Sequence, residues 1–170
     1  VESLTQECHV FSSKEVMSRV RGGNNTATIR ISNEPIQALR YTADLVFLFN
    51  DHAIERLLPR LTPKSQIIGE EGFLKDDLKA KYALTPINFM SIAKEAGNRL
   101  YFNTAMFGYI LGLLSASVKY AHQVITHRFE KRGEPVVLGN IAAFDKGYQL
   151  GQDASIKIDF NPRVGFKPMK

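Results

Sequence analysis

One apolar stretch limits the folds that this chain can adopt. Residues 43–50, Ala-Asp-Leu-Val-Phe-Leu-Phe-Asn, are typical of a strand that is buried on both faces of a sheet. An apolar face at helical spacing follows over 54–61, and a second apolar strand is expected at 65–69. A strand, a helix and a strand within about 25 residues form a βαβ unit, which predicts parallel pairing and a right-handed crossover.

The remaining pattern adds two strands before this unit and several helices after it. Residues 9–13 and the alternating, β-branched stretch 26–32 are strand candidates. Residues 70–85 are charged and less regular, and Pro86 is expected to open a helix. Helical spacing predicts helices over 86–96, 101–117, 118–131 and 136–151. We therefore predict an α/β fold with three α/β/α layers, Rossmann-like, with a mostly parallel or mixed sheet and an α-rich C-terminal half.

The length of 170 residues fits one domain of ordinary size. We expect this domain to span residues 1–156. Residues 157–170 contain Pro162 and Pro168 and show no periodicity. They are expected to form a linker or tail toward a following domain.

Charge and cysteine content exclude several classes of function. The net charge is +5, but Lys and Arg are scattered, so we expect no nucleic-acid partner, and a docking face for an acidic partner fits this charge at least as well. Cys8 is the only cysteine, and one thiol cannot hold an iron–sulfur cluster or form an internal disulfide. The reduced cytoplasm is the default compartment for such a chain. His122 and His127 lie about 140° apart on a helix, so they predict no metal site.

The longest uncharged stretch has two interpretations. Nineteen residues without a formal charge lie between Arg99 and Lys119. A membrane span needs about 20 mostly apolar residues, but Asn103 and other polar residues interrupt this stretch. We favour a buried helix in which Gly108 and Gly112 let another element approach closely, and we expect no membrane segment. The nucleotide-binding Gly-x-Gly-x-x-Gly and P-loop motifs are absent, as is a Gly-x-Ser-x-Gly elbow, so no independent catalytic site is predicted.

Four short motifs follow one another in a recognisable order. They are Arg-Gly-Gly-Asn-Asn at 21–25, Ile-Ser-Asn-Glu-Pro-Ile at 31–36, Asp-Leu-Val-Phe-Leu-Phe-Asn at 44–50 and Ile-Ala-Lys-Glu-Ala-Gly-Asn at 92–98. The helix with Asn103, and Asn140 and Gly147 further on, fit the same pattern. Together, over about residues 9–151, these motifs resemble the gamma domain of the 2-oxoacid:ferredoxin (acceptor) oxidoreductases. The family normally opens with a strand and a Gly-x-Gly-Gly-Gln-Gly turn, which this sequence lacks.

The resemblance implies a role in oxidative decarboxylation of a 2-oxoacid to an acyl-coenzyme A. It implies thiamine diphosphate and iron–sulfur clusters in alpha and beta partner subunits or domains, coenzyme A as cosubstrate, and a ferredoxin-like electron carrier. It also implies an oligomeric assembly. No thiamine motif is present in this sequence, so we expect no catalytic residue and no cofactor bound by this chain alone. The isolated chain is expected to be inactive, with a structural, docking and coenzyme A-side role.

The Arg-Gly-Gly turn supplies the first candidate ligand or interface residues. Arg19 and Arg21 flank a turn with free backbone N–H groups, and two roles stay open for them. Their guanidinium groups can hold a coenzyme A phosphate or a carboxylate bidentately, or they can form an interdomain salt bridge, with Glu15 as one partner. Gly22 and Gly23 are expected to serve backbone shape, with any ligand contact through their amides.

Three asparagines complete the set of candidates. Asn24 favours turn geometry by itself. Asn50 follows a parallel strand at its carboxyl end, where open α/β sheets place ligands, although capping of the next helix by Asn50 or Asp51 is the favoured role. Asn103 needs a hydrogen-bond partner in an uncharged helix, which favours internal bracing. Two rival functions stay open: a stand-alone Rossmann-like nucleotide or coenzyme A-binding module, and a basic scaffold that assembles a complex.

Overall fold

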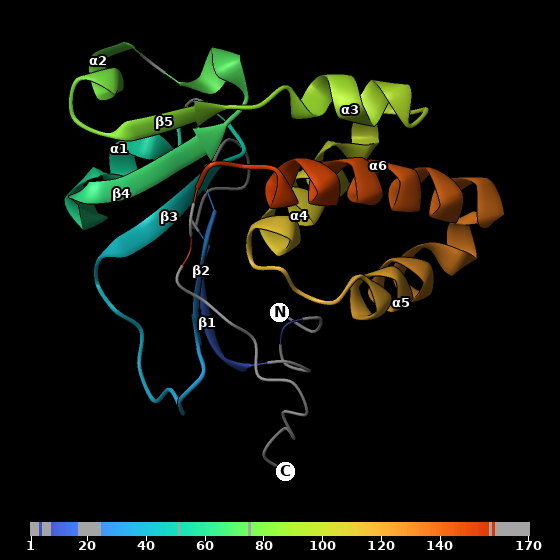
Figure 1. Cartoon of the computed structure of the whole chain (residues 1–170), viewed down its shortest axis with the longest axis horizontal. Coiled ribbons are helices and arrows are strands. Elements are labelled where there is room, and N and C mark those ends of the chain that lie inside the picture. Colours follow the sequence, from blue (N-terminus) through green and yellow to red (C-terminus); the bar gives the residue numbers. More distant parts are fainter. Residues whose placement is uncertain are drawn as a thin grey trace. The chain divides into compact units, whose positions relative to one another are not determined.

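The computed structural model describes residues 4, 8–16, 25–50, 52–74, 76–156 and 158 (Figure 1). The chain divides into two compact units. A sheet unit consists of Phe11–Arg30 and Ala38–Asn88. A helical unit consists of Val1–Val10, Ile31–Gln37 and Phe89–Lys170.

A parallel three-stranded sheet organises the sheet unit. Its strands β3 (Ala43–Leu48), β4 (Leu61–Gly69) and β5 (Ala83–Pro86) pair in the order β3-β4-β5. The helix α1 (Ile54–Leu57) and a 3₁₀ turn, Leu58–Arg60, connect β3 to β4. In the register, Val46 pairs with Ile67, and Ile67 pairs with Leu84. The predicted βαβ unit with parallel strands is therefore confirmed.

Two details of this unit differ from the prediction. The helix after β3 is only four residues long, and β4 begins at Leu61 rather than at residue 65. Pro59 lacks the N–H that an α-helix needs at this point, so the chain tightens into the 3₁₀ turn and then extends. The strand β5 was not predicted, because four residues show too little alternation by themselves. Pro86 ends this edge strand instead of opening a helix.

Ser65 fastens the start of β4 to the start of β3, where the register shifts between Ala43 and Leu45. The Ser65 side chain is fully buried. Its hydroxyl donates to the carbonyl of Ala43 at 2.6 Å and accepts the Thr62 N–H at 2.8 Å. This hydroxyl therefore satisfies backbone groups that the irregular register leaves unpaired.

We predict that Ser65→Ala lowers the free energy of unfolding by about 1–2 kcal/mol, because it leaves two backbone groups without this partner. Ser12→Ala, at an exposed position of β1, is the matched control and is expected to have little effect. Urea unfolding of both variants measures the difference. Equal stability of Ser65→Ala and wild type would contradict the assigned role of the hydroxyl.

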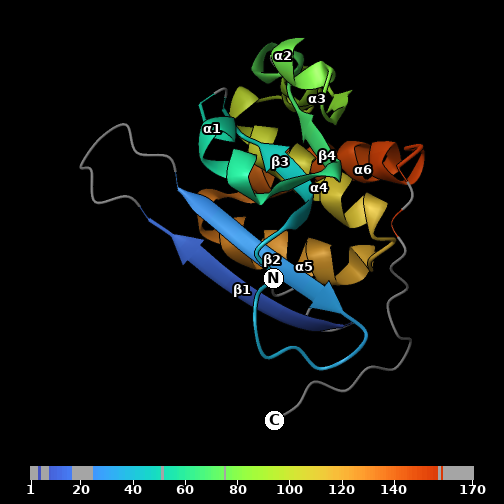
Figure 2. The same cartoon turned by 90° about the vertical axis from the view of Figure 1, so that its left-hand side faces the viewer.

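A two-stranded sheet precedes the parallel one in the chain. Its strands β1 (His9–Glu15) and β2 (Thr26–Ser32) run in opposite directions (Figure 2). Both strands were predicted, and β1 is two residues longer than expected. Arg60 ties this sheet to the parallel one. Its guanidinium donates to the Thr28 hydroxyl at 2.9 Å and to the Tyr41 carbonyl at 3.0 Å.

Four helices dominate the helical unit: α3 (Phe89–Glu95), α4 (Phe102–Leu113), α5 (Val118–Phe129) and α6 (Glu134–Gln152). All four were predicted, with shifted ends. The helix α4 ends early because Ser115 adopts a left-handed conformation, with φ of 50°. The helix α6 begins early because Pro135 occupies its first turn, where a missing N–H is tolerated. The predicted α/β class and α-rich C-terminal half are confirmed.

The helices α4 and α6 pack in parallel with their backbones in contact. Thr104 meets Asn140 across the pair, Gly108 meets Phe144, and Gly112 meets Tyr148. The constant separation of 36 residues shows that the two helices run in the same direction. A Cβ atom on Gly108 or Gly112 would overlap carbonyl oxygens of α6. The predicted buried helix with closely approached glycines is confirmed. Within the described part of the chain, no helix is long and apolar enough to cross a membrane.

Candidate functional site

Asn50 lies at the carboxyl edge of the parallel sheet, and it is the predicted ligand residue of the sheet unit that the described residues include. Asn50 follows β3, and its Oδ1 accepts the N–H of His52 at 3.1 Å. Asn50 does not cap α1, because that helix begins at Ile54 with Ala53 in the N-cap position and no side-chain cap. The predicted capping role of Asn50 is therefore wrong. Its amide instead closes a local turn at the edge of the sheet.

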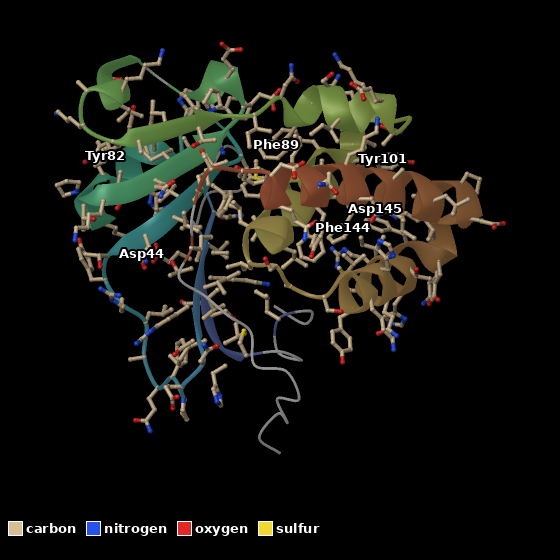
Figure 3. All side chains as sticks on the ribbon, in the orientation of Figure 1. Asp44, Tyr82, Phe89, Tyr101, Phe144 and Asp145 are labelled. Atoms are coloured by element: carbon tan, nitrogen blue, oxygen red, sulfur yellow. The ribbon has the colours of Figure 1, made fainter. Side chains whose placement is uncertain are left out.

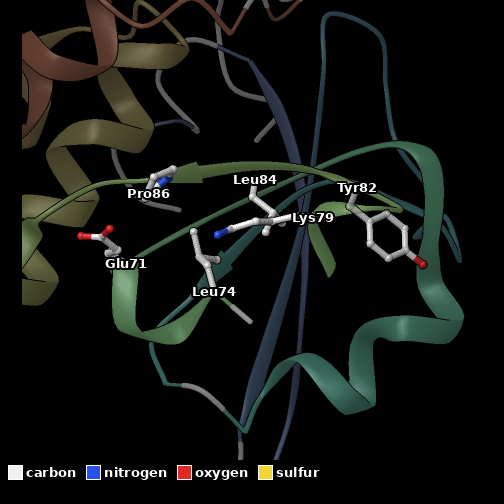
Figure 4. Close-up of a pocket in the computed structure, with 6 residues that line it drawn as sticks. All are labelled: Glu71, Leu74, Lys79, Tyr82, Leu84 and Pro86. Carbon is white, nitrogen blue, oxygen red and sulfur yellow. The ribbon is translucent and has the colours of Figure 1, made fainter. Parts of the chain in front are cut away.

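A hollow of about 270 Å³ lies beside β5, an edge strand of the parallel sheet (Figure 4). Glu71 and Pro86 lie at one end of the hollow and Tyr82 lies at the other. The Lys79 side chain extends toward the end with Glu71. The full lining is Glu71, Leu74, Lys79, Tyr82, Leu84 and Pro86. A carboxylate, an ammonium group and a phenol on an apolar floor suit a small polar molecule. Sequence reasoning missed this hollow because its lining comes from the segment expected to be irregular.

The Arg-Gly-Gly turn lies outside the described residues. This concerns Arg19, Arg21, Gly22, Gly23 and Asn24, whose ligand or interface roles stay predictions.

Glu15, the suggested salt-bridge partner of these arginines, is described. Its carboxylate lies 3.4 Å from the Arg56 guanidinium and 3.9 Å from that of Arg60. Glu15 therefore already has two cationic neighbours within the sheet unit.

The polar brace of the helical unit is Asn140 rather than Asn103. Asn103 is exposed on α4, so its predicted role as an internal brace is wrong. Asn140 is 2% exposed, donates from Nδ2 to the Val136 carbonyl at 2.8 Å, and accepts the Thr104 hydroxyl at 2.6 Å. Asn140 shares a helix face with Phe144 and Gly147, and this spacing was the signal that could have identified it.

Histidines and the cysteine take local partners in the helical unit. The His122 Nε2 lies 2.6 Å from the Asp145 carboxylate, and the His127 Nδ1 lies 3.4 Å from Glu130. The Cys8 thiol is buried and donates to the Leu4 carbonyl at 3.4 Å. Among the described residues, no group of three or more His, Cys, Asp or Glu side chains could hold a metal ion.

An ion pair joins α3 to α6. The Lys146 ammonium donates to the Glu95 carboxylate at 2.7 Å, and the Ser91 hydroxyl donates to the same carboxylate at 3.1 Å. The hydrogen bond from Lys146, then that from Ser91, lowers the pKa of Glu95 below its ordinary value. The ionised Glu95 carboxylate therefore contributes to folding stability above the pKa that Glu95 has in the unfolded chain. This contribution is lost as the pH falls through the lower pKa that Glu95 has in the folded protein.

We predict that Lys146→Met raises the pKa of Glu95 toward its ordinary value, because it removes the strongest of these interactions. An NMR pH titration of the Glu95 carboxyl measures the change. Lys94→Met, which removes a neighbouring cation on α3, is the control. An unchanged Glu95 titration in Lys146→Met would show that the ion pair does not persist in solution.

These observations define the class of protein. A parallel βαβ sheet unit and a helical unit with close-packed glycine helices form an α/β fold of the type found in oxidoreductase gamma subunits. The model of the pyruvate ferredoxin/flavodoxin oxidoreductase family matches residues 3–150, and this chain belongs to that family. No curated protein matches the chain.

Solved structures support the same fold. The 2-oxoglutarate:ferredoxin oxidoreductase from Magnetococcus marinus, solved with 2-oxoglutarate, coenzyme A and succinyl-CoA bound, matches 98% of this chain at 23% identity and a TM-score of 0.84. This chain spans only 30% of that protein.

Two separate subunits of similar length also match. The gamma subunit of a keto/oxoacid ferredoxin oxidoreductase from Geobacter sulfurreducens has a TM-score of 0.64 at 19% identity, and the match covers 90% of this chain and 87% of that one. The PORC subunit of pyruvate oxidoreductase from Thermotoga maritima has a TM-score of 0.61 at 19% identity, with 87% and 83% covered. The fold therefore occurs both within a longer chain and as a separate subunit.

Proposed function

We propose that this chain is the gamma domain of a thiamine diphosphate-dependent 2-oxoacid:ferredoxin oxidoreductase. In this role it docks against the thiamine-binding alpha and beta subunits or domains and contributes to the coenzyme A side of the assembly. The observation that carries the proposal is the family match over residues 3–150. The similarity of 98% of the chain to part of an oxidoreductase that binds coenzyme A supports it.

The residues of this chain favour a supporting role. The partner domains would hold thiamine diphosphate and iron–sulfur clusters, which supply decarboxylation and electron transfer when bound. Cys8 is the single cysteine of the chain and is buried, so it does not suit cluster ligation. The described residues instead supply rigid packing at the α4–α6 contact and a polar sheet edge at Asn50.

The Arg-Gly-Gly turn is the proposed contact on the coenzyme A side. Glu15 already has Arg56 and Arg60 as neighbours, which favours a phosphate over Glu15 as the partner of Arg19 and Arg21. In the assembled enzyme, replacing both arginines by alanine is expected to raise the KM for coenzyme A more than the KM for the 2-oxoacid.

Reconstitution tests the proposed function. The tagged chain is produced with and without the thiamine-binding polypeptides of its source. Turnover is then measured with a 2-oxoacid, coenzyme A and an oxidised ferredoxin or viologen dye. We expect no turnover by the chain alone and co-purification with a protein that contains thiamine diphosphate. Decarboxylation by the isolated chain, or a failure to associate with that protein, would overturn the proposal.

A stand-alone binding module is the second candidate function. The observation that favours it is the hollow beside β5, which Glu71, Lys79 and Tyr82 line with polar groups. A module of this kind binds a nucleotide or coenzyme A without partners. Calorimetric titration of the isolated chain with coenzyme A and with ATP tests it. Micromolar binding that Lys79→Met weakens would support the module, and the absence of heat with both ligands would remove it.

A further inference from the structure

Two exposed leucines lie at the same end of the α4–α6 helix pair. Leu100 is 78% exposed in the 3₁₀ turn Arg99–Tyr101, and Leu138 is 57% exposed on the first turns of α6. The Tyr101 ring lies against Gly139, which follows Leu138 directly. Figure 3 shows Tyr101 beside α6. We call Leu100, Leu138 and the exposed Asn103 the docking patch.

Hydrogen bonds hold the backbone of the turn with Leu100 and join the two helices near the docking patch. Asn98 caps the turn that carries Leu100, since its Oδ1 accepts the Leu100 N–H at 2.9 Å. Close behind the patch, the Thr104 hydroxyl donates to Asn140. Neither leucine belongs to the buried core. Large apolar side chains that stay this exposed, with polar residues around them, are a feature of protein–protein interaction surfaces.

Positive charge borders the docking patch. Arg99 precedes Leu100, and Lys131 and Arg132 form the end of the 3₁₀ turn that leads into α6. All three are exposed, and within the described ranges none of them makes an ion pair. The Arg132 guanidinium lies over the Phe129 ring, 5.8 Å from its centroid. Glu130, in the same 3₁₀ turn, and Glu134, which opens α6, reduce this positive charge without cancelling it.

We propose that the docking patch binds the thiamine-binding part of the oxidoreductase, on an apolar surface with an acidic rim. This inference rests on the proposed function and assigns its partner contact. In the Magnetococcus protein the matching part belongs to a much longer chain, so a domain of this fold has a permanent neighbour there. A second copy of this chain fits poorly, because Arg99 and Lys131 would meet like charges in a chain with a net charge of +5.

The test is a comparison of partner capture by matched leucine variants. The tagged chain is produced together with the thiamine-binding polypeptide, and bound thiamine diphosphate per tagged chain is measured after purification. Leu100→Asp combined with Leu138→Asp is expected to weaken the association at least tenfold. Leu150→Asp, at a 43% exposed leucine at the other end of α6, is the control and is expected to change it less than twofold. Circular dichroism and Tm verify that all variants fold.

The charged border has its own test. Charge reversal of Arg99, Lys131 and Arg132 to glutamate is expected to weaken association and to flatten its dependence on salt concentration.

The outcomes separate the docking patch from the proposed function. If the wild-type chain captures the thiamine-binding polypeptide and the double leucine variant captures it equally well, the docking patch alone is overturned. Absence of capture by the wild-type chain would overturn the proposed function and the patch with it. A change from dimer to monomer in sedimentation, with capture unchanged, would assign the patch to self-association and also overturn the proposal.

Discussion

Gly147→Ala is expected to destabilise the protein by about 3 kcal/mol, which lowers the Tm by roughly 10 °C. Two effects of opposite sign compete at this position. Alanine is the better helix former, and in an exposed helix the change would stabilise by about 1 kcal/mol. The tertiary contact opposes this gain, because a Cβ at residue 147 would overlap the carbonyl oxygen of Ala105 on α4. The Ala105 carbonyl is a backbone group and cannot rotate away as a side chain can. The steric overlap therefore outweighs the gain in helix propensity.

Substitution of two other glycines separates the steric overlap at residue 147 from the effects of helix propensity and backbone strain. Gly72 has no atom within 4 Å of the Cβ position, so Gly72→Ala is expected to change stability by less than about 0.5 kcal/mol. Gly97 also has free space but a φ of +110°, so Gly97→Ala is expected to cost about 1 kcal/mol from backbone strain alone. Thermal unfolding of all three variants ranks the effects. A Gly147→Ala protein that is more stable than wild type would show that α4 and α6 do not pack this closely.

Asn140→Asp is expected to cost about 3–5 kcal/mol at neutral pH, because it buries a carboxylate without a compensating charge. The Thr104 hydroxyl can still donate to one oxygen. The other oxygen would face the Val136 carbonyl, which now accepts from the Asn140 amide at 2.8 Å. Burial raises the pKa of the introduced carboxyl in the folded state. The loss of stability therefore becomes smaller as the pH falls below that folded-state pKa, where the carboxyl is neutral.

Asn103→Asp is the matched control for this variant. It makes the same chemical change 37 positions earlier, at an exposed position of α4, and is expected to alter stability by less than about 0.5 kcal/mol. Guanidinium unfolding of both variants between pH 4 and pH 7 measures the contrast. Equal effects of the two substitutions, or a pH-independent loss in Asn140→Asp, would contradict the buried Asn140–Thr104 brace.

The sequence by itself determined the local structure and the family. The apolar run 43–50 and the spacing over 54–69 were enough for a parallel βαβ unit, because both faces of such a strand must be buried. Gly108 and Gly112 in an uncharged helix predicted a close approach, because a helix without charges is expected to be covered. The ordered motifs between 21 and 98 indicated the gamma domain, which the family match over residues 3–150 supports.

Only the tertiary structure decided which residues meet. Asn103 and Asn140 look alike in the sequence, but the packing of α4 on α6 exposes the first and buries the second. The strand β5 forms because β4 offers it a free edge, and four residues carry too little pattern to show this. The partner helix of Gly108 lies 36 residues away, and no local pattern encodes which helix comes back to cover it. Local preferences fix elements over a few residues, whereas burial and steric fit depend on segments that are distant in the chain.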